Sequence, residues 1–367
     1  MAYKDLHDKP FEENTIAKLE IFEDYAQAWI PTFVMQNVSS ICIFDFFAGT
    51  GYDKNGVAGS PIRILDKIKE QVISIFQRKV KVRVFLNEFN TEKFELLKKS
   101  CEEYLKINDY VGQAIEINYF NEDFENLFHK LLPIIKDFPS LVYLDQNGIK
   151  FLSEKYILEL EKMRQTDFLY FASASYLWRF GDSREFKAHL DVEMSEVKSE
   201  PYRFVHRSFI NQLKKKLPLN TQLKLYPFSL KKGANIYGII FGASHPLAVD
   251  KFLRIAWKRN EINGEANFDI DDDNLKKQRS LFGNQPLTKI EAFQENVRNK
   301  ILNKEIVDNF QLFGFVLEEG HLPKHATEIL RKMKSEGEIW FDGKFPLITY
   351  ENVYSIKRKI SYLVLKK

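Results

Sequence analysis

The sequence predicts an α/β fold with a mostly parallel sheet, a closing antiparallel hairpin and a smaller C-terminal domain. Strand patterns alternate with helical patterns through the first half of the chain, which is typical of βαβ units. Two later strands, residues 221–228 and 235–241, are joined through a short loop that contains Gly233, which indicates a hairpin. The periodicity changes after about residue 263. These observations predict seven strands in one sheet, followed by a separate unit.

The expected elements follow one another along the chain. Besides the hairpin, strands are expected at residues 41–45, 80–86, 114–119, 141–144 and 167–174. Helices are expected at residues 16–29, 62–77, 91–106 and 124–132, and a polar, helical insertion at about 181–216. Ser60 as the N-cap and Pro61 at the first helical position mark the start of the second helix. Pro31 indicates a break or kink near the end of the first helix.

The length of 367 residues suits two domains. We expect an α/β domain at residues 1–262, a linker at 263–288, where several Asp precede a Lys/Arg run, and a domain at 289–367. In this last part, helical patterns at 290–302 and 323–334 precede a predicted hairpin at 337–345, with Asp342-Gly343 as its turn. Helices followed by a hairpin resemble a winged helix.

Composition and charge narrow the function classes. Hydrophobic residues make up 44% of the chain and no apolar run approaches the ~20 residues that span a bilayer, so we expect a cytoplasmic protein without membrane contact. The two cysteines have no CxxC or Cys/His neighbour, and no metal site is expected. Residues 285–367 carry eleven Lys and three Arg against nine Glu and two Asp, which accounts for the whole net charge of +3. This surplus permits nucleic-acid contact, although a solvated face would explain it equally.

The stretch Ile41 to Gly51 carries the main functional prediction. A buried strand ends in Asp45, at the place where open α/β sheets bind their ligands. Gly49 and Gly51 then allow the main chain to approach a ligand closely. Dinucleotides and ATP fit less well, because Asp53 stands where a third glycine is needed and no Lys-Ser/Thr follows. An ordinary glycine turn after a core strand is the other interpretation.

The spacing Asp-x-x-Ala-Gly-x-Gly at residues 45–51 resembles motif I of the class I S-adenosylmethionine-dependent methyltransferases. In that class, which has a Rossmann-like sheet, this loop wraps the methionine part of the cofactor. The resemblance implies S-adenosylmethionine as the cofactor. It implies these cofactor-binding residues in the loop and at the start of the next helix: Asp45, Phe46, Phe47, Ala48, Gly49, Gly51 and Ser60.

Two more acids fit the same resemblance. Glu88 follows the second strand, where these methyltransferases place a carboxylate that can accept hydrogen bonds from both ribose hydroxyls. Asp123 follows the third strand, where an acid commonly contacts the adenine amino group, and Phe124 is a candidate stacking wall. Glu88 can also be read as a solvated acid at a strand end. Asp123 can equally be the cap of the helix that contains Phe124.

The fourth strand ends in Asp145-Gln146-Asn147-Gly148, the position of motif IV next to the transferred methyl group. Amino-methyltransferases often carry Asp/Asn-Pro-Pro-aromatic there, and both prolines are missing. Asp145 and Asn147 are the predicted catalytic residues, because an acid and an amide can accept a proton or orient a nucleophile. Without the prolines, direct methylation of an exocyclic amine is a weaker prediction.

The assembled order resembles the three-Cys-motif partner proteins, bacterial chains with a methyltransferase-like domain. The residues that carry this resemblance are Lys18, Tyr25 to Trp29, the loop at 45–51, Gly59-Ser60-Pro61, Asp145-x-x-Gly148, Phe241 to Pro246 and Trp257-Lys258. The family usually has Asp-Pro-aromatic-Gly where this chain has residues 145–148. The resemblance implies a separate, cysteine-bearing partner protein.

Two functions follow as expectations. The first is a methyltransferase that acts on nucleic acid, DNA or RNA, or on a target associated with nucleic acid. The second is a catalytically inactive module that keeps the fold and binds nucleic acid or the cysteine-motif partner. The missing prolines favour the second, whereas the joint presence of Asp45, Gly49, Gly51, Glu88 and Asp123 favours a working cofactor site.

Overall fold

The computed structural model describes residues 10–146, 153–187, 190–279 and 286–365 of the chain. Its contacts divide the chain into two compact units, Met1–Ser244 and His245–Lys367. This division lies earlier in the chain than the predicted domain boundary at residue 262. No helix in the described ranges is long and apolar enough to cross a membrane.

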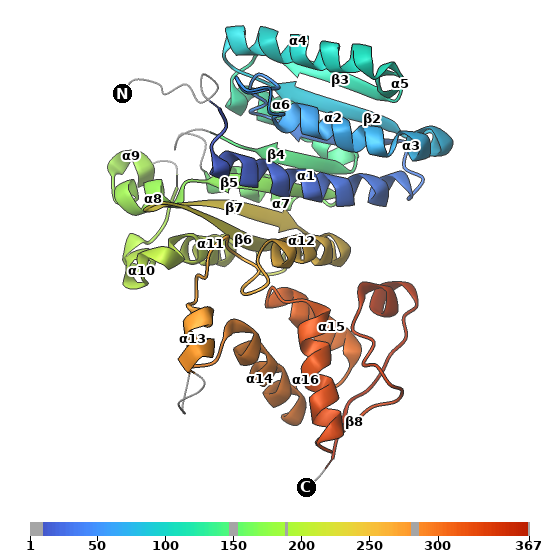
Figure 1. Cartoon of the computed structure of the whole chain (residues 1–367), viewed down its shortest axis with the longest axis vertical. Coiled ribbons are helices and arrows are strands. Elements are labelled where there is room, and N and C mark those ends of the chain that lie inside the picture. The colour runs from blue at the N-terminus through green and yellow to red at the C-terminus, as the bar shows by residue number, and fades with distance from the viewer. Residues whose placement is uncertain (1–9, 147–152, 188–189, 280–285, 366–367) are drawn as a thin grey trace. The chain divides into compact units, whose positions relative to one another are not determined.

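The first unit is built on one seven-stranded sheet with the order β3-β2-β1-β4-β5-β7-β6. The strands are β1 (Ser40–Asp45), β2 (Lys81–Asn87), β3 (Ile115–Phe120), β4 (Ser140–Leu144), β5 (Thr166–Ala172), β6 (Lys224–Lys232) and β7 (Asn235–Ala243). Strands β1 to β5 are parallel, and β7 runs antiparallel to both β5 and β6. Figure 1 shows this sheet, with β2 to β7 labelled. The predicted sheet and its closing hairpin are confirmed.

The central strands are buried on both faces, as expected for a parallel sheet covered by helices. All six residues of β1 are buried. Phe44 lies opposite Phe85 in the register of β1 and β2, and their rings stack with centroids 4.5 Å apart. Phe85 in turn stacks on Phe120 at 6.4 Å. This row of rings ties together the three strands that end at the predicted cofactor site.

Helices connect and cover the strands of this unit. They are α1 (Glu13–Val34), α2 (Ser60–Glu70), α3 (Val72–Arg78), α4 (Thr91–Ile107), α5 (Asp109–Gly112), α6 (Phe124–Asp137), α7 (Glu154–Glu161), α8 (Ala174–Phe180), α9 (Arg184–Lys187), α10 (Met194–Ser199) and α11 (Val205–Lys216). Helix α1 packs beside α2 and α3, where Glu23 forms ion pairs with Arg63 and Lys67. The predicted insertion is helical, and its last helix, α11, packs on β6 and β7.

Three local predictions in this unit need correction. The N-cap of α2 is Gly59, so Ser60 is already helical and Pro61 lies within the first turn. The helix predicted at 62–77 is divided at Gln71 into α2 and α3. Helix α1 continues through Pro31 to Val34. The proline removes only one backbone hydrogen bond, near the end of this 22-residue helix.

The second unit is mainly helical. It contains α12 (Pro246–Arg259), α13 (Asp273–Arg279), α14 (Lys289–Leu302), α15 (Asn309–Glu318) and α16 (Pro323–Ser335), and a two-stranded sheet of β8 (Ile339–Trp340) and β9 (Leu363–Val364). Thr288 and Glu291 form a reciprocal capping box that starts α14. Trp257 is buried and donates from Nε1 to the carbonyl of Gly320 at 2.9 Å, which fixes α12 to the turn before α16.

The hairpin predicted at residues 337–345 is wrong. β8 pairs with β9, with Trp340 opposite Leu363, so the antiparallel partner comes from much further along the chain. Pro346, which has no N–H to donate, follows soon after the predicted turn and disfavours a second strand there. Much of the predicted linker is also packed. Ala266 and Ile270 are buried, and residues 273–279 form α13.

Candidate functional site

Asp45 ends β1 and is almost fully buried, with 1% of its surface exposed. Its Oδ1 accepts a hydrogen bond from the N–H of Phe47 at 3.1 Å. Its Oδ2 is also buried and accepts no hydrogen bond of ordinary geometry from the described residues, although the Ser60 hydroxyl lies close enough to lower the pKa of Asp45. An unpartnered buried acceptor is costly, so this oxygen is suited to a ligand that brings its own donor.

The pKa of Asp45 is raised from its ordinary value to about 7, chiefly because the side chain is buried. The Ser60 hydroxyl and the Phe47 N–H lower this pKa, whereas the negative charges of Asp145 and Glu88 raise it. A cation bound beside Asp45 would favour its ionised form. The site is therefore electrostatically suited to a positively charged ligand.

The glycine loop after β1 has the conformation that the sequence indicates. Gly49 and Gly51 have φ angles of 65° and 88°, in the left-handed region. A Cβ on Gly51 would lie only 2.7 Å from the Cβ of Ser100 on α4. The carbonyl of Gly51 accepts a hydrogen bond from the N–H of Gly59 at 2.7 Å. The space beside Gly51 is thus filled by the protein itself, and a side chain at this position would crowd Ser100.

Other predicted loop residues have structural contacts. Phe46 is buried and lies edge-on to Phe124, with centroids 5.4 Å apart. Phe47 is partly exposed, and the N–H of Ala48 donates to the carbonyl of Asn87 at 2.8 Å. Ser60 is buried at the start of α2. These contacts place the loop firmly between the ends of β1 and β2.

Asp53, which stands in place of a third glycine, organises the chain after the loop. Its Oδ1 accepts from the N–H groups of Asn55 and Val57, and its Oδ2 accepts from the N–H of Phe11. The carboxylate thereby closes the turn that leads into α2. This role explains why an acid occupies the position.

Glu88 follows β2 and is partly exposed. Its Oε1 accepts from the N–H of Asn90 at 2.8 Å, and its carbonyl accepts from the side chain of Asn121 at 2.7 Å. The buried Asn87 donates from Nδ2 to the carbonyls of Phe46 and Glu122. Asn87 and Asn121 therefore join the ends of β1, β2 and β3. Sequence reasoning missed both, although an Asn at each strand end was a usable signal.

Asp123 is the N-cap of α6, since its Oδ1 accepts from the N–H of Glu125 at 3.0 Å. This is the capping role that the sequence left open, and an adenine contact stays a prediction. Phe124 is only 3% exposed and packs against Phe47, Phe128 and Tyr156. Its ring belongs to a buried aromatic cluster. The exposed ring near Glu88 is Phe89, with 69% of its surface accessible.

Asp145 follows β4 and pairs with Lys18 of α1. Lys18 Nζ lies 2.5 Å from Asp145 Oδ1 and also contacts Oδ2. The side chains of Lys18 and Asp145 are 9% and 16% exposed. The ammonium also lies 4.2 Å from the centroid of the Phe171 ring. Lys18 was recognised from the sequence only as part of a family resemblance, because its partner is far away in the chain.

The rest of the predicted catalytic stretch is described only in part. Gln146 is buried, and its Nε2 donates to the carbonyl of Phe171 at 2.7 Å, which ties the end of β4 to β5. Asn147 and Gly148 lie outside the described residues. The structure thus brings Asp45, Glu88, Asp123 and Asp145 to the carboxyl ends of four neighbouring parallel strands.

These observations define the class of fold. Five parallel strands, with an antiparallel seventh strand inserted between the fifth and the sixth, form the sheet of the class I methyltransferase fold. Within the second unit, residues 269–344 match the family model described as GMT-like wHTH domain. The winged-helix assignment of the C-terminal segment is therefore confirmed.

Comparison with solved structures gives distant likenesses. One is to the O-methyltransferase from Bacillus cereus in complex with SAH, at 12% identity and a TM-score of 0.34, covering 62% of this chain and 86% of that chain. Another is to the O-methyltransferase TomG from Streptomyces achromogenes in complex with SAM, at 10% identity and a TM-score of 0.32, covering 63% and 89%. A third is to SCL7 of Oryza sativa, at 10% identity and a TM-score of 0.31, covering 63% of this chain and 82% of that chain. No curated protein matches the chain. The fold assignment rests on the strand order and not on these likenesses.

Proposed function

We propose that the chain is an S-adenosylmethionine-dependent methyltransferase that acts on nucleic acid or on a target associated with nucleic acid. The observation that carries the proposal is the arrangement at the carboxyl ends of the parallel strands, which we call the sheet edge. Three adjacent parallel strands, β1, β2 and β3, lead into Asp45, Glu88 and Asp123, and the glycine loop begins at the first of them. Such an edge of an open α/β sheet is where ligands bind.

The residues of this edge fit the proposed cofactor. Asp45 Oδ2 is a buried acceptor without a described partner, which suits a ligand amino group. Glu88 would accept from the ribose hydroxyls, and the exposed ring of Phe89 provides an apolar face for the base. When bound, S-adenosylmethionine supplies an electrophilic methyl group.

On the acceptor side, Asp145 is the proposed catalytic residue. Its carboxylate can accept a hydrogen bond from the nucleophile and hold the nucleophile for attack. Lys18 and the Tyr143 hydroxyl, which lies 3.4 Å from Asp145 Oδ2, fix the direction of the carboxylate. Lys18 is thus a positioning residue. Asn147 remains part of the proposal as a second orienting group.

The second unit supports a nucleic-acid target. Its matched winged-helix segment includes α16, which exposes Lys324, Arg331 and Lys332. Phosphate contacts of Lys and Arg supply most of the affinity of non-specific nucleic-acid binding. Resemblance to the three-Cys-motif partner proteins supports the further proposal that a separate cysteine-bearing protein joins the complex.

A second candidate function is a non-catalytic module that binds nucleic acid or that partner protein. The ion pair of Asp145 with Lys18 favours it, because the Lys18 ammonium contacts both carboxylate oxygens that a nucleophile would otherwise use. Under this alternative the cofactor site would serve binding or regulation only.

One experiment separates the two candidates. The full chain is incubated with methyl-labelled S-adenosylmethionine and, separately, with single-stranded DNA, duplex DNA and RNA. Label should enter one of these polymers, and Glu88→Ala and Asp145→Asn should each reduce the incorporation. If the chain binds S-adenosylhomocysteine but labels none of the polymers, the non-catalytic alternative replaces the proposal.

A further inference from the structure

A surface beside the acceptor side of the sheet exposes aromatic rings. Helix α8 begins directly after β5, and its Tyr176 and Phe180 are 38% and 41% exposed. These residues lie four apart on one face of the helix, with ring centroids 4.5 Å from each other. The opposite side of α8 is anchored, since Leu177 is fully buried and Ser175 Oγ donates to the carbonyl of Ile236 at 2.9 Å. The two rings are therefore displayed on a rigid support.

Basic side chains accompany these rings. Arg179 of α8 and Arg184 and Lys187 of α9 are exposed. Arg179 donates to Asn235 Oδ1 at 2.6 Å, which holds α8 against the start of β7. The nearby acid Asp182 is paired with Lys198 at 2.5 Å and also interacts electrostatically with Lys187, so the positive charge rests chiefly on Arg179 and Arg184. We call Tyr176, Arg179, Phe180, Arg184 and Lys187 the α8 surface.

The order of the strands places the α8 surface close to the proposed methyl-transfer position. β5 pairs with β4, which leads into Asp145, and Gln146 is bonded to the carbonyl of Phe171 on β5. Figure 1 shows α8 and α9 at the sheet edge where α1, the helix of Lys18, begins. The cofactor acids lie on the other side of β1, at the ends of β2 and β3.

We infer that the α8 surface binds single-stranded nucleic acid. Bases stack on Tyr176 and Phe180, and the cationic side chains of Arg184 and Lys187 contact the phosphates. Stacking rings combined with a positive surface are how proteins hold single strands without sequence preference. A duplex keeps its base faces inside the stack, so it cannot use these rings. The inference rests on the proposed function and deepens it, because it makes the acceptor an unpaired strand.

The test measures binding of a fluorescent 20-nucleotide oligo(dT) to the full chain. Tyr176→Ala/Phe180→Ala should weaken binding at least tenfold, because each base-to-ring stack is a substantial part of single-strand affinity. Arg184→Ala/Lys187→Ala should reduce the slope of log affinity against log salt by about 1.4, since each single-strand phosphate contact contributes about 0.7.

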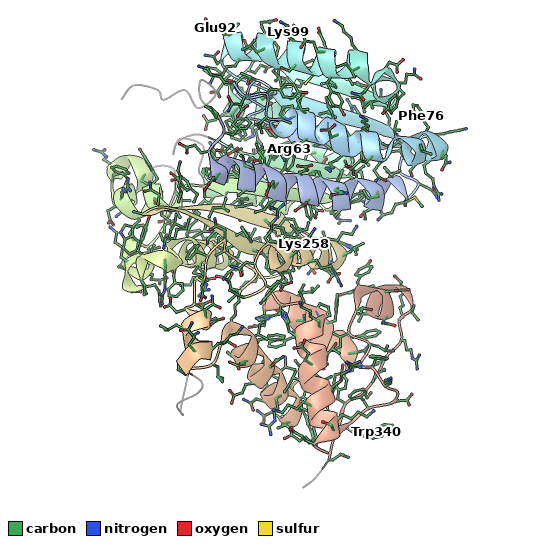
Figure 2. All side chains as sticks on the ribbon, viewed as in Figure 1. Arg63, Phe76, Glu92, Lys99, Lys258 and Trp340 are labelled. Carbon is green, nitrogen blue, oxygen red and sulfur yellow. The ribbon has the colours of Figure 1, made fainter. Side chains whose placement is uncertain are left out.

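Matched controls come from the same unit. Phe76 at the end of α3 is 46% exposed and Lys99 on α4 is 71% exposed in its side chain, and Figure 2 shows both. Phe76→Ala and Lys99→Ala should leave oligo(dT) binding unchanged. Unchanged thermal midpoints and S-adenosylhomocysteine affinity confirm that the α8 variants are folded.

Three results would overturn the inference. The first is oligo(dT) binding that survives the double aromatic substitution. The second is a duplex that binds as tightly and loses affinity equally in the variants. The third is polyglutamate of equal charge that competes as well as oligo(dT), which would indicate an unspecific polyanion site. Failure of the proposed cofactor function is seen separately, as loss of S-adenosylhomocysteine binding in the unsubstituted chain.

Discussion

Asp45 combines its proposed role in cofactor binding with a cost in stability. Its pKa is raised in the folded chain from 3.8 to about 7, chiefly by burial, so its contribution to stability is present below pH 3.8 and is lost as the pH rises through 7. Asp45→Asn removes this ionisation. We expect the ligand-free variant to be roughly 1–4 kcal/mol more stable than the wild type at pH 8. Urea denaturation at pH 8 measures the difference.

The same ionisation predicts pH-dependent cofactor binding. S-adenosylmethionine affinity should rise between pH 6 and pH 8, by up to about tenfold per unit below pH 7, because the cationic ligand favours ionised Asp45. Asp45→Asn should bind more weakly and lose this dependence. Glu92→Gln, at the exposed acid that Figure 2 labels on α4, is the control and should behave as the wild type. An Asp45→Asn variant that keeps the pH dependence would contradict the account.

Lys18 and Asp145 form a largely buried pair, so each depends on the other. Lys18→Met leaves Asp145 without its counter-charge and should cost about 3–5 kcal/mol in the free energy of unfolding. The double variant Lys18→Met/Asp145→Asn should recover most of this loss, as a double-mutant cycle would show. Lys162→Met breaks an exposed pair with Glu159 and should cost less than about 1 kcal/mol. Equal costs for Lys18→Met and Lys162→Met would refute the buried pairing.

At the scale of the element, two glycines in and after the loop allow the cost of backbone strain to be measured apart from the cost of crowding. Gly51 and Gly56 both have left-handed φ angles, but only Gly51 faces a close neighbour, Ser100. Gly56→Ala should cost about 1–2 kcal/mol through backbone strain alone. Gly51→Ala should cost about 1–3 kcal/mol more, through crowding, and Ser100→Gly should recover that excess in the double variant. Thermal unfolding of the set is the measurement, and equal losses at Gly51 and Gly56 would argue against this packing.

In the second unit, the start of α16 should respond to acid. His321 and His325 are buried, with Nδ1 atoms 3.2 Å apart. Burial, together with the charge of Lys289, lowers the pKa of His321 to about 2. Burial, together with the charges of Lys324 and Lys289, lowers the pKa of His325 to about 4. The stability they contribute is therefore complete above pH 6.5 and is lost as the pH falls below it, by up to about 1.4 kcal/mol per unit for each histidine.

Hydrogen exchange of α14 to α16 measures this response. Protection in the wild type, corrected for intrinsic rates, should fall between pH 7.5 and pH 5.5. His321→Leu/His325→Leu should show a smaller fall, because the titrating groups are gone. A fall of the same size in the double variant would assign the acid response to other groups.

The elements that were predicted correctly are those whose sequence signals lie close together in the chain. The strand, the acid and the two glycines of residues 41–51 stand close together in the chain, and Glu88, Asp123 and Asp145 likewise follow soon after their strands. The pairing of β8 with β9 and the contact of Lys18 with Asp145 join distant residues, and no local pattern indicates them. Helix α15 was missed because its sequence is apolar on nearly every side and gives no clear period.

For the whole molecule, the order of elements could be predicted because alternating patterns specify a parallel sheet with few alternative topologies. The side chains at the sheet edge and their contacts could be predicted only in part. Glu88 and Asp123 were found as strand-end acids. The hydrogen bonds by which Asn87 and Asn121 join those ends depend on how the strands are assembled, so the sequence shows the two amides but not their partners. The ring of Phe124 was placed by proximity to Asp123 and proves to be buried, because neighbouring aromatic residues from α6 and α7 cover it.

The central claim is that the sheet edge at Asp45, Glu88 and Asp123 binds S-adenosylmethionine. Its most direct test is a thermal-shift titration of the full chain with S-adenosylmethionine and S-adenosylhomocysteine, with NAD and ATP as comparison ligands. At ~100 times the dissociation constant, a ligand that binds only the folded state should add about 2.7 kcal/mol of stability. The account predicts this gain for both adenosyl ligands and a smaller one in Glu88→Ala at the same concentration. No shift with either ligand, or an equal shift with NAD, would contradict it.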